Sequence, residues 1–187
     1  MQKPDGLYFA PNVRFRDLYD ADANELADAL ESRSMNWFLM PAKQIAQTAP
    51  FSSGIIVTCF IDAASEIEGI NVIDWLKEAV PASSELDPRR TKKSIADSFY
   101  EDVRHGLIHH SRLSRGAEFS LDLNSAIEVV NSVLVVNPSI LIVDVIKRWE
   151  ETLSMIRVDE KKHQKFLEEI RRVFRVDFEA DETWDRM

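Results

Sequence analysis

Apolar residues that recur at three- and four-residue intervals along most of the chain constrain its fold more than any other feature. One such stripe runs through residues 21–40, where Leu26, Leu30 and Trp37 belong to it. Because an α-helix has 3.6 residues per turn, each stripe predicts an amphipathic helix with a buried apolar face. A chain of 187 residues is long enough to bury one core. We therefore expect a mainly α protein, a bundle of four to six helices in a single domain spanning residues 1–187.

Prolines and glycines place the breaks between these helices. Pro41 is expected to kink or end the first helix, and Pro50 to end its continuation. The next helix stops at Gly69. Its first half, GIIVTCFI, also fits a buried strand, but the helical spacing continues through Ile67 and favours a helix. Further stripes predict helices over residues 72–80, 91–108, 142–156 and 166–174.

The segment 117–137 departs from the helical period. Its AIEVVNSVLVVN stretch holds two β-branched runs separated by Asn131 and Ser132, a pair that suits a hairpin turn. This pattern predicts a small β-hairpin insertion in the bundle. Residues 1–20 are expected to form an irregular lead-in, and residues 179–187 a frayed tail.

The composition excludes several classes of protein. A net charge of −9 disfavours general adhesion to nucleic acid or to anionic membranes. No apolar stretch approaches the ~20 residues of a transmembrane helix, and the N-terminus has no secretory pattern, so we expect a cytoplasmic protein without a membrane partner. The single cysteine, Cys59, excludes an intrachain disulfide and is expected to be a buried, inert thiol. Trp37, Trp75 and Trp149 lie in apolar stripes and are expected in the core.

Three of the four histidines lie within six residues, in the stretch SFYEDVRHGLIHHSRLSRG. They are His105, His109 and His110, and Arg104 comes directly before them. On an ideal helix Arg104 and His109 lie about 140° apart, at opposite borders of the apolar stripe. The two side chains would converge if the helix unwinds near Gly106, or if two copies pack through this stripe across a two-fold axis.

The charge around this cluster favours an anionic ligand. Residues 87–116 contain seven Lys or Arg residues against four Asp or Glu residues, a surplus of three positive charges. Guanidinium groups bind phosphate oxygens with paired hydrogen bonds. We therefore consider His110, Arg112 and Arg115 as phosphate contacts.

The segment Arg104-His105-Gly-Leu-Ile-His109 resembles the Arg-x4–6-His motif of the HEPN superfamily. In that family the motif lies near the end of a helix in a four- or five-helix bundle, so the resemblance covers the motif helix and the helical architecture around it. It implies a metal-independent endoribonuclease that acts as a homodimer with a shared cleft. Arg104 and His109 become the catalytic pair, and His105 orients the arginine or contacts phosphate. His110 also fits the motif, at a spacing one residue longer.

The implied reaction suits these side chains. The ribose 2′-hydroxyl of RNA attacks the adjacent phosphorus, which yields a 2′,3′-cyclic phosphate and a 5′-hydroxyl without any cofactor. Histidine serves as acid or base near neutral pH, and arginine stabilises charge on the phosphate oxygens. From the resemblance alone we also expect a role as a toxin or phage-defence effector, with an antitoxin as a further partner.

Other interpretations of the same residues stay open. Asp62 and Glu66, one turn apart on a neighbouring helix, either orient the motif residues or form a solvated edge. His105, His109 and Glu101 have the spacing of a metal site, although the adjacent arginine would repel a cation. The cluster also fits a solvent-facing helix end whose histidines interact with the helix dipole. The last alternative is a non-catalytic HEPN-like module that binds RNA, a nucleotide or a partner protein.

Overall fold

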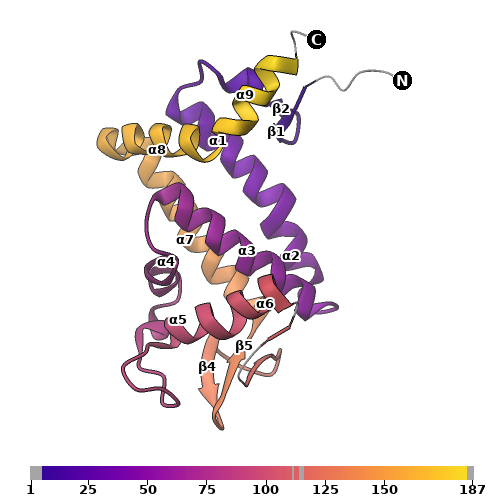
Figure 1. Cartoon of the computed structure of the whole chain (residues 1–187), viewed down its shortest axis with the longest axis vertical. Coiled ribbons are helices and arrows are strands. Elements are labelled where there is room, and N and C mark those ends of the chain that lie inside the picture. Colours follow the sequence, from indigo (N-terminus) through magenta and orange to yellow (C-terminus); the bar gives the residue numbers. More distant parts are fainter. Residues whose placement is uncertain (1–5, 111, 114–115, 185–187) are drawn as a thin grey trace.

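The computed structural model describes residues 6–110, 112, 113 and 116–184, with side chains for all of these except 108–110 and 181–184. The chain is mainly helical and carries two small sheets (Figure 1). The α-helices are α1 (Ala23–Ser34), α2 (Met40–Ile45), α3 (Pro50–Glu68), α4 (Val72–Ala79), α5 (Ile95–Ser98), α6 (His105–His110), α7 (Pro138–Val158), α8 (Glu160–Val173) and α9 (Arg175–Trp184). Two π-helical segments are η2 (Met35–Leu39) and η4 (Phe99–Arg104), and two 3-10 turns are η1 (Phe15–Leu18) and η3 (Pro81–Ser84). The strands are β1 (Tyr8–Ala10), β2 (Val13–Arg14), β3 (Ala117–Phe119), β4 (Ile127–Val130) and β5 (Val133–Val136).

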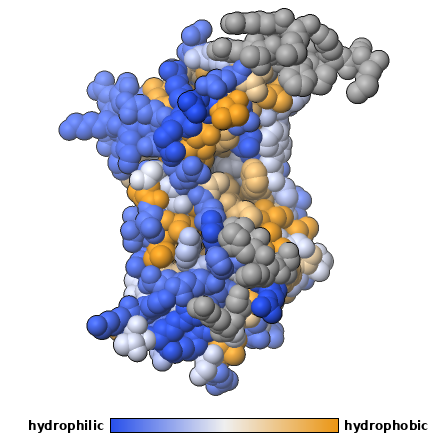
Figure 2. Space-filling model, in the orientation of Figure 1, coloured by the Kyte–Doolittle hydropathy of each residue, from blue (hydrophilic) through white to orange (hydrophobic). Residues whose placement is uncertain are grey.

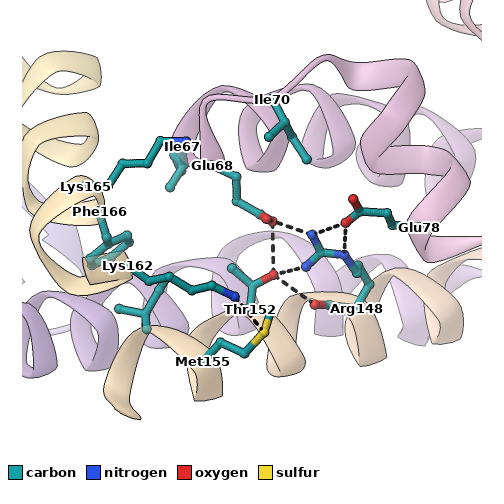
Figure 3. Close-up of a pocket in the computed structure, with 11 residues that line it drawn as sticks. Ile67, Glu68, Ile70, Glu78, Arg148, Thr152, Met155, Lys162, Lys165 and Phe166 are labelled. Atoms are coloured by element: carbon teal, nitrogen blue, oxygen red, sulfur yellow. Dashed lines mark hydrogen bonds and ion pairs between the residues drawn. The ribbon is translucent and has the colours of Figure 1, made fainter. Parts of the chain in front are cut away.

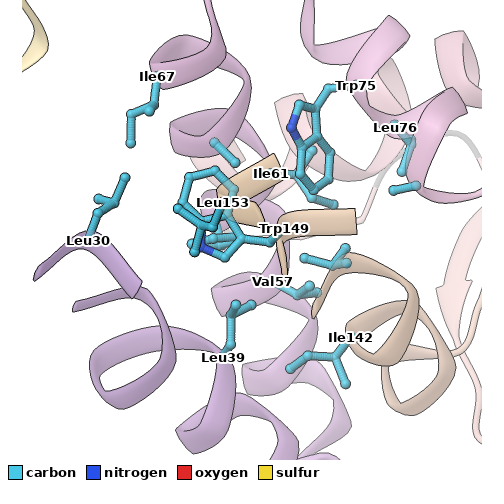
Figure 4. Packing of buried hydrophobic residues seen from close by; sticks show 14 of the residues in the cluster. Leu30, Leu39, Val57, Ile61, Ile67, Trp75, Leu76, Ile142, Trp149 and Leu153 are labelled. Carbon is cyan, nitrogen blue, oxygen red and sulfur yellow. The ribbon is translucent and has the colours of Figure 1, made fainter. Parts of the chain in front are cut away.

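The long helices α1, α3 and α7 form the middle of the molecule, where α3 and α1 both pack against α7. Helices α8 and α9 lie with β1 and β2 at one end, and α5, α6 and the second sheet lie at the other (Figure 1). The core between the long helices contains the fully buried side chains of Leu30, Val57, Ile61, Ile142 and Trp149 (Figure 4). The predicted helical bundle with a small β insertion is confirmed.

The helix boundaries show how the prolines act. The GIIVTCFI segment is helical, and Gly69 ends α3 in the left-handed conformation, with φ of 64°, as expected. Pro41 does not end the first helix, because the π-helical η2 leads directly into α2. Pro50 begins α3 instead of ending the preceding helix, at a position where a missing backbone N–H costs nothing.

The tryptophans divide between core and surface. Trp75 and Trp149 are fully buried, as predicted. Trp37 is 40% exposed, so its predicted core position is wrong. It lies in η2, whose wider turn changes the face that each residue presents, and the Arg33 guanidinium covers its ring at 5.0 Å from the ring centroid.

The second sheet contains the predicted hairpin and one further strand. β4 and β5 pair antiparallel, and the turn between them places Asn131 and Ser132 at φ of 50° and 64°, as a type I′ turn requires. The third strand, β3, lies at the start of the segment 117–137 that departs from the helical period. Its parallel pairing with β5 was not predicted and gives the strand order β3-β5-β4. A Cβ atom at Gly54 of α3 would lie 2.3 Å from the Phe119 ring, so the glycine leaves room for β3 to pack on α3.

Both chain ends are more ordered than the sequence suggested. The expected irregular lead-in, residues 1–20, contains β1, β2 and η1, and Phe9 is fully buried. The Phe9 ring makes edge contacts with Phe15 at 5.3 Å and with Phe174 at 5.1 Å. Helix α9 extends through most of the segment 179–187 that was expected to fray, and residues 185–187 lie outside the described part of the chain.

Helix α3 corrects one expectation from the composition. Among the described residues it is the one helix long and apolar enough to cross a membrane, with 19 residues and a mean hydropathy of 1.2. Half of this apolar window is buried inside the protein, where α3 packs against α7 and α8. A core helix meets the same two criteria of length and composition.

A buried arginine on α7 joins this helix to α3 and α4. Arg148 of α7 donates from Nη2 to Glu68 of α3 at 2.8 Å and to Glu78 of α4 at 2.6 Å, and it also contacts Thr152. The Trp75 indole donates to the second oxygen of Glu68 at 2.6 Å. Burial by itself lowers the pKa of Arg148, but the charges and hydrogen bonds of Glu68 and Glu78 outweigh it and raise the pKa. The guanidinium therefore stays charged and holds α3, α4 and α7 together.

We expect Arg148→Ala to lower the free energy of unfolding by about 3 kcal/mol, because Glu68 keeps its charge in a largely buried place without its partner. Arg157→Ala is a matched control on the same helix, since Arg157 pairs with Asp28 and Glu31 at the surface. It should cost less than about 1 kcal/mol. Urea unfolding of the two variants measures both values, and equal losses would contradict the role given to Arg148.

Candidate functional site

The histidine cluster lies on one continuous helical segment made of α5, η4 and α6, here called the motif helix. It begins at Ile95, where Ser94 forms a capping box: its hydroxyl accepts from the Asp97 N–H at 3.2 Å, and the Asp97 carboxylate accepts from the Ser94 N–H at 2.8 Å. This pairing satisfies two backbone donors that the first turn of a helix would leave unbonded. The predicted helix over residues 91–108 is therefore present but starts four residues later.

The middle of the motif helix is π-helical, from Phe99 to Arg104. A π turn closes hydrogen bonds to the fifth residue along, so it holds one residue more than an α turn. Positions after Phe99 are consequently rotated relative to the ideal α-helix that the sequence-based prediction assumed. Unwinding near Gly106 was one of the two alternatives considered from the sequence, and the irregular segment ends at Arg104, just before that residue.

The apolar stripe of the motif helix is already covered by the same chain. Ile95, Ala96, Phe99, Val103 and Leu107 are all buried in the core. Tyr100, the sixth residue of the predicted stripe, is half-buried. Because the other five side chains are used in the core of the same chain, they are not free to form the predicted contact between two copies.

Arg104 has two defined partners. Its Nε donates to Asp62 Oδ2 of α3 at 2.7 Å, and its guanidinium lies over the Tyr100 ring at 5.2 Å from the ring centroid. The Arg104 and Asp62 side chains are 24% and 23% exposed, so the pair is partly open to solvent. Of the two acids considered from the sequence, Asp62 orients the arginine. Glu66 lies at an exposed edge, 3.7 Å from Arg172.

The hollow that Arg104 lines is small. It lies between α3, the start of α4 and the motif helix, and has a volume of about 10 Å³. That volume suits a single water molecule. A ligand of nucleotide size is too large for this hollow.

A cluster of buried charges joins the motif helix to the loop that precedes it. Asp87 and Asp102 are fully buried. Arg89 binds Asp87 at 2.8 Å and Asp102 at 3.4 Å, while Arg90 binds Asp102 at 2.5 Å. The hydroxyl of Ser98, on the motif helix, donates to Asp87. We call these five residues the ion cluster. Breaking such a buried network by removing one member is costly, because the remaining charges lose their partners.

Several of the positive charges counted around the motif are paired with acids and are not free to bind an anionic ligand. Arg90 and Lys93 also bind Glu101, at 2.8 Å for the arginine. Three of the seven cations, Arg89, Arg90 and Lys93, are thus neutralised by acids of the same segment and form an internal clamp. Sequence reasoning counted these charges but missed their pairing. The available signal was the match of two adjacent arginines with two adjacent acids, at 89–90 and 101–102.

The remaining predicted residues are only partly placed. His105 is exposed at the start of α6, and Arg112 is exposed, with its backbone N–H donating to the carbonyl of Gly106 at 3.3 Å. The backbones of His109 and His110 belong to α6, but their side chains lie outside the described part of the structure. Arg115 also lies outside the described residues.

The described side chains contain no group of three His, Cys, Asp or Glu residues that could hold a metal ion. Glu101, the acid of the metal hypothesis, binds Arg90 and Lys93 instead. Cys59 lies one turn before Asp62 and is exposed, so its predicted burial is wrong. Partial desolvation and the Asp62 carboxylate nevertheless raise the pKa of its thiol, which leaves it unactivated.

The ion cluster predicts a specific loss of stability in acid. Burial by itself raises the pKa of Asp87, but hydrogen bonds from Arg89 and Ser98 outweigh it and lower the pKa from 3.8 to about 2. A lowered pKa stabilises the fold above pH 4, and this contribution is lost as the pH falls toward 2. We expect Asp87→Asn to lower the free energy of unfolding by at least about 2 kcal/mol at pH 7 and by progressively less below pH 4.

Urea unfolding between pH 7 and pH 2.5 measures this difference. Asp122→Asn, an exposed acid in the loop before β4, is the control and should stay close to wild type at every pH. A gap between wild type and Asp87→Asn that does not change with pH would show that the carboxylate charge is not what stabilises the cluster.

Comparison with known proteins does not assign a family. No family model matches the chain, no curated protein matches it, and no solved structure is significantly similar to it. The motif from Arg104 to His109 and the helical architecture therefore remain the basis for inferring a function.

Proposed function

We propose that this protein is a metal-independent endoribonuclease of the HEPN type, with Arg104 and His109 as its catalytic pair. One observation carries the proposal. The motif arginine is held at the end of η4 by the Asp62 carboxylate and the Tyr100 ring, yet a quarter of its side chain remains open to solvent. A guanidinium fixed in this way is preorganised to receive a phosphate group without first giving up its own freedom.

The proposed chemistry assigns one task to each residue. Arg104 stabilises the charge that develops on the non-bridging phosphate oxygens when the 2′-hydroxyl attacks phosphorus. His109, five residues later on the same helical segment, transfers the proton. His105 is exposed beside Arg104 and contacts the phosphate. His110, Arg112 and Arg115 are candidate contacts to neighbouring phosphates.

Asp62 acts as a positioning residue in this proposal. It contacts Arg104 rather than the RNA, and it fixes the direction of the guanidinium through Nε. Because the ion pair is partly exposed, its loss should cost less than about 1 kcal/mol of stability. A change at Asp62 therefore tests orientation separately from folding.

The active form is proposed to be a homodimer with a shared cleft. The hollow at Arg104 is too small for a nucleotide, so a second copy would supply the opposite wall. Since the apolar stripe is buried, the contact has to use other surface. Figure 2 shows hydrophilic surface over α8 and over the region of α5 on this face, with apolar surface between them.

The proposed cytoplasmic role as a toxin or defence effector, with an antitoxin partner, rests on the resemblance alone.

The proposal is tested by incubating labelled single-stranded and hairpin RNA with purified wild type, Arg104→Ala and His109→Ala in excess EDTA. Wild type should produce ends that carry a 2′,3′-cyclic phosphate, identified by mass spectrometry. Both variants should lose at least about 100-fold in rate, because general acid–base catalysis typically contributes ~10²–10⁴-fold. RNA with 2′-O-methyl groups should stay intact, since it lacks the nucleophile.

Three further variants serve as controls. Arg157→Ala removes a surface arginine of α7 and should keep full activity. Asp62→Asn should lower kcat while it lowers the unfolding temperature by no more than about 4 °C, and Asp62→Glu should restore part of the rate. Equal cleavage by wild type and His109→Ala would remove the catalytic assignment. RNA that binds in an Arg104-dependent way but is never cleaved would identify the non-catalytic binding module.

A further inference from the structure

Arg33 and Arg148 both lie against aromatic rings, but they differ in their acid partners. Arg148 lines the hollow between α3, α4, α7 and α8, where it binds Glu68 and Glu78 (Figure 3). Arg33, in the last turn of α1, forms no ion pair with any residue of the described chain. Asp177 attracts it only through space, from an exposed position. The charge of Arg33 is therefore not neutralised by a contact.

The surroundings of Arg33 hold its guanidinium in place but leave most of its hydrogen-bond donors unused. Nη1 donates to the Phe9 carbonyl at 2.6 Å, and the other N–H groups have no acceptor among the described residues. The rings of Phe9, Trp37 and Phe174 surround the guanidinium, with centroids 5.5, 5.0 and 5.2 Å from Cζ. These rings attract the cation through their faces and also keep water away from it. Burial accordingly lowers the pKa of Arg33, although the side chain stays charged at neutral pH.

A pocket of about 170 Å³ lies beside this guanidinium, between α1, η2, α3, α7 and α8. Arg33 and Phe174 both line it, and Phe60 and Trp149 add further aromatic wall. The Ser34 hydroxyl in the wall is already satisfied, because it accepts from the Trp149 indole at 2.8 Å and donates to a backbone carbonyl at 2.7 Å. An apolar cavity of about 150 Å³ is large enough for benzene. The pocket therefore has room for a single aromatic ring.

We propose that this pocket binds a small monocarboxylate whose apolar body is about the size of one aromatic ring. The apolar body lies against Phe60 and Trp149, where its burial drives binding. The carboxylate accepts from Arg33, whose planar guanidinium offers paired N–H donors in the geometry that a carboxylate matches. Arg104 does not line this pocket, so the inference does not rest on the proposed nuclease.

One acid among the lining residues limits which anions fit. Glu66 has a side chain that is 58% exposed and lies 3.7 Å from Arg172, so water and a neighbouring cation weaken its repulsion of a ligand. A ligand with a second carboxylate would still meet this charge without a second lining cation to offset it. The charges of the pocket therefore favour a monocarboxylate over a dicarboxylate.

The test uses phenylacetate and its neutral analogue phenylacetamide, which differ in charge but hardly in shape. Isothermal titration calorimetry should show saturable one-to-one binding of phenylacetate to wild type, at least about tenfold tighter than that of phenylacetamide. Arg33→Gln should weaken phenylacetate binding by at least about tenfold and leave phenylacetamide binding unchanged, because it removes the charge but not the apolar walls.

Two further variants check the location of the site, with folding verified by circular dichroism. Ala63 lines the pocket from an exposed position of α3, so Ala63→Phe should fill it without changing a core side chain and should abolish binding of both compounds. Arg171→Gln is the matched control, since Arg171 also donates to a backbone carbonyl, at 3.4 Å, but lies outside the pocket. It should bind phenylacetate like wild type. The proposal is overturned if phenylacetate shows no saturable binding up to about 10 mM, if both compounds bind equally, or if Arg33→Gln or Ala63→Phe binds phenylacetate as wild type does.

Discussion

Two buried carboxylates, Asp87 and Asp102, determine where the motif helix lies. Each is fully enclosed, and each holds at least one arginine of the preceding loop. Arg89 extends the same network to the carbonyl of Gly116, beyond the far end of the helix, at 3.2 Å. Charges that are buried in this way are stable only with all partners in place, so the loop, the helix and the following strand take their positions together. The placement of Arg104 against Asp62 depends on that arrangement.

Periodicity predicted the parts of the fold that are governed by apolar burial. The helix through GIIVTCFI, the stop at Gly69 and the hairpin at Asn131-Ser132 follow from spacing and turn chemistry. The ends of the chain were predicted less well, because the burial of Phe9 depends on residues distant in sequence, among them Arg33 of α1 and Phe174. The parallel pairing of β3 was missed for the same reason, since its partner follows it by more than ten residues.

The sequence identified residues of the candidate site, but it did not show which of the charged side chains pair with one another. The sequence pointed to Arg104 and raised Asp62 as its partner, yet it did not indicate that neighbouring arginines are consumed by buried acids. A charge count cannot separate a solvated cation from one locked in an ion pair, because both add the same unit.

The π turn from Phe99 to Arg104 also bears on how such a site can arise and be lost. A helix that gains one residue accommodates it as a wider turn, and every later position then faces a new direction. Deleting one residue from this stretch would let the backbone relax into a regular α-helix and swing the arginine off Asp62, while the buried residues before it keep their packing. The orientation of the Arg104 guanidinium therefore depends on the number of residues in the π-helical segment. A substitution does not change that number, whereas an insertion or a deletion does.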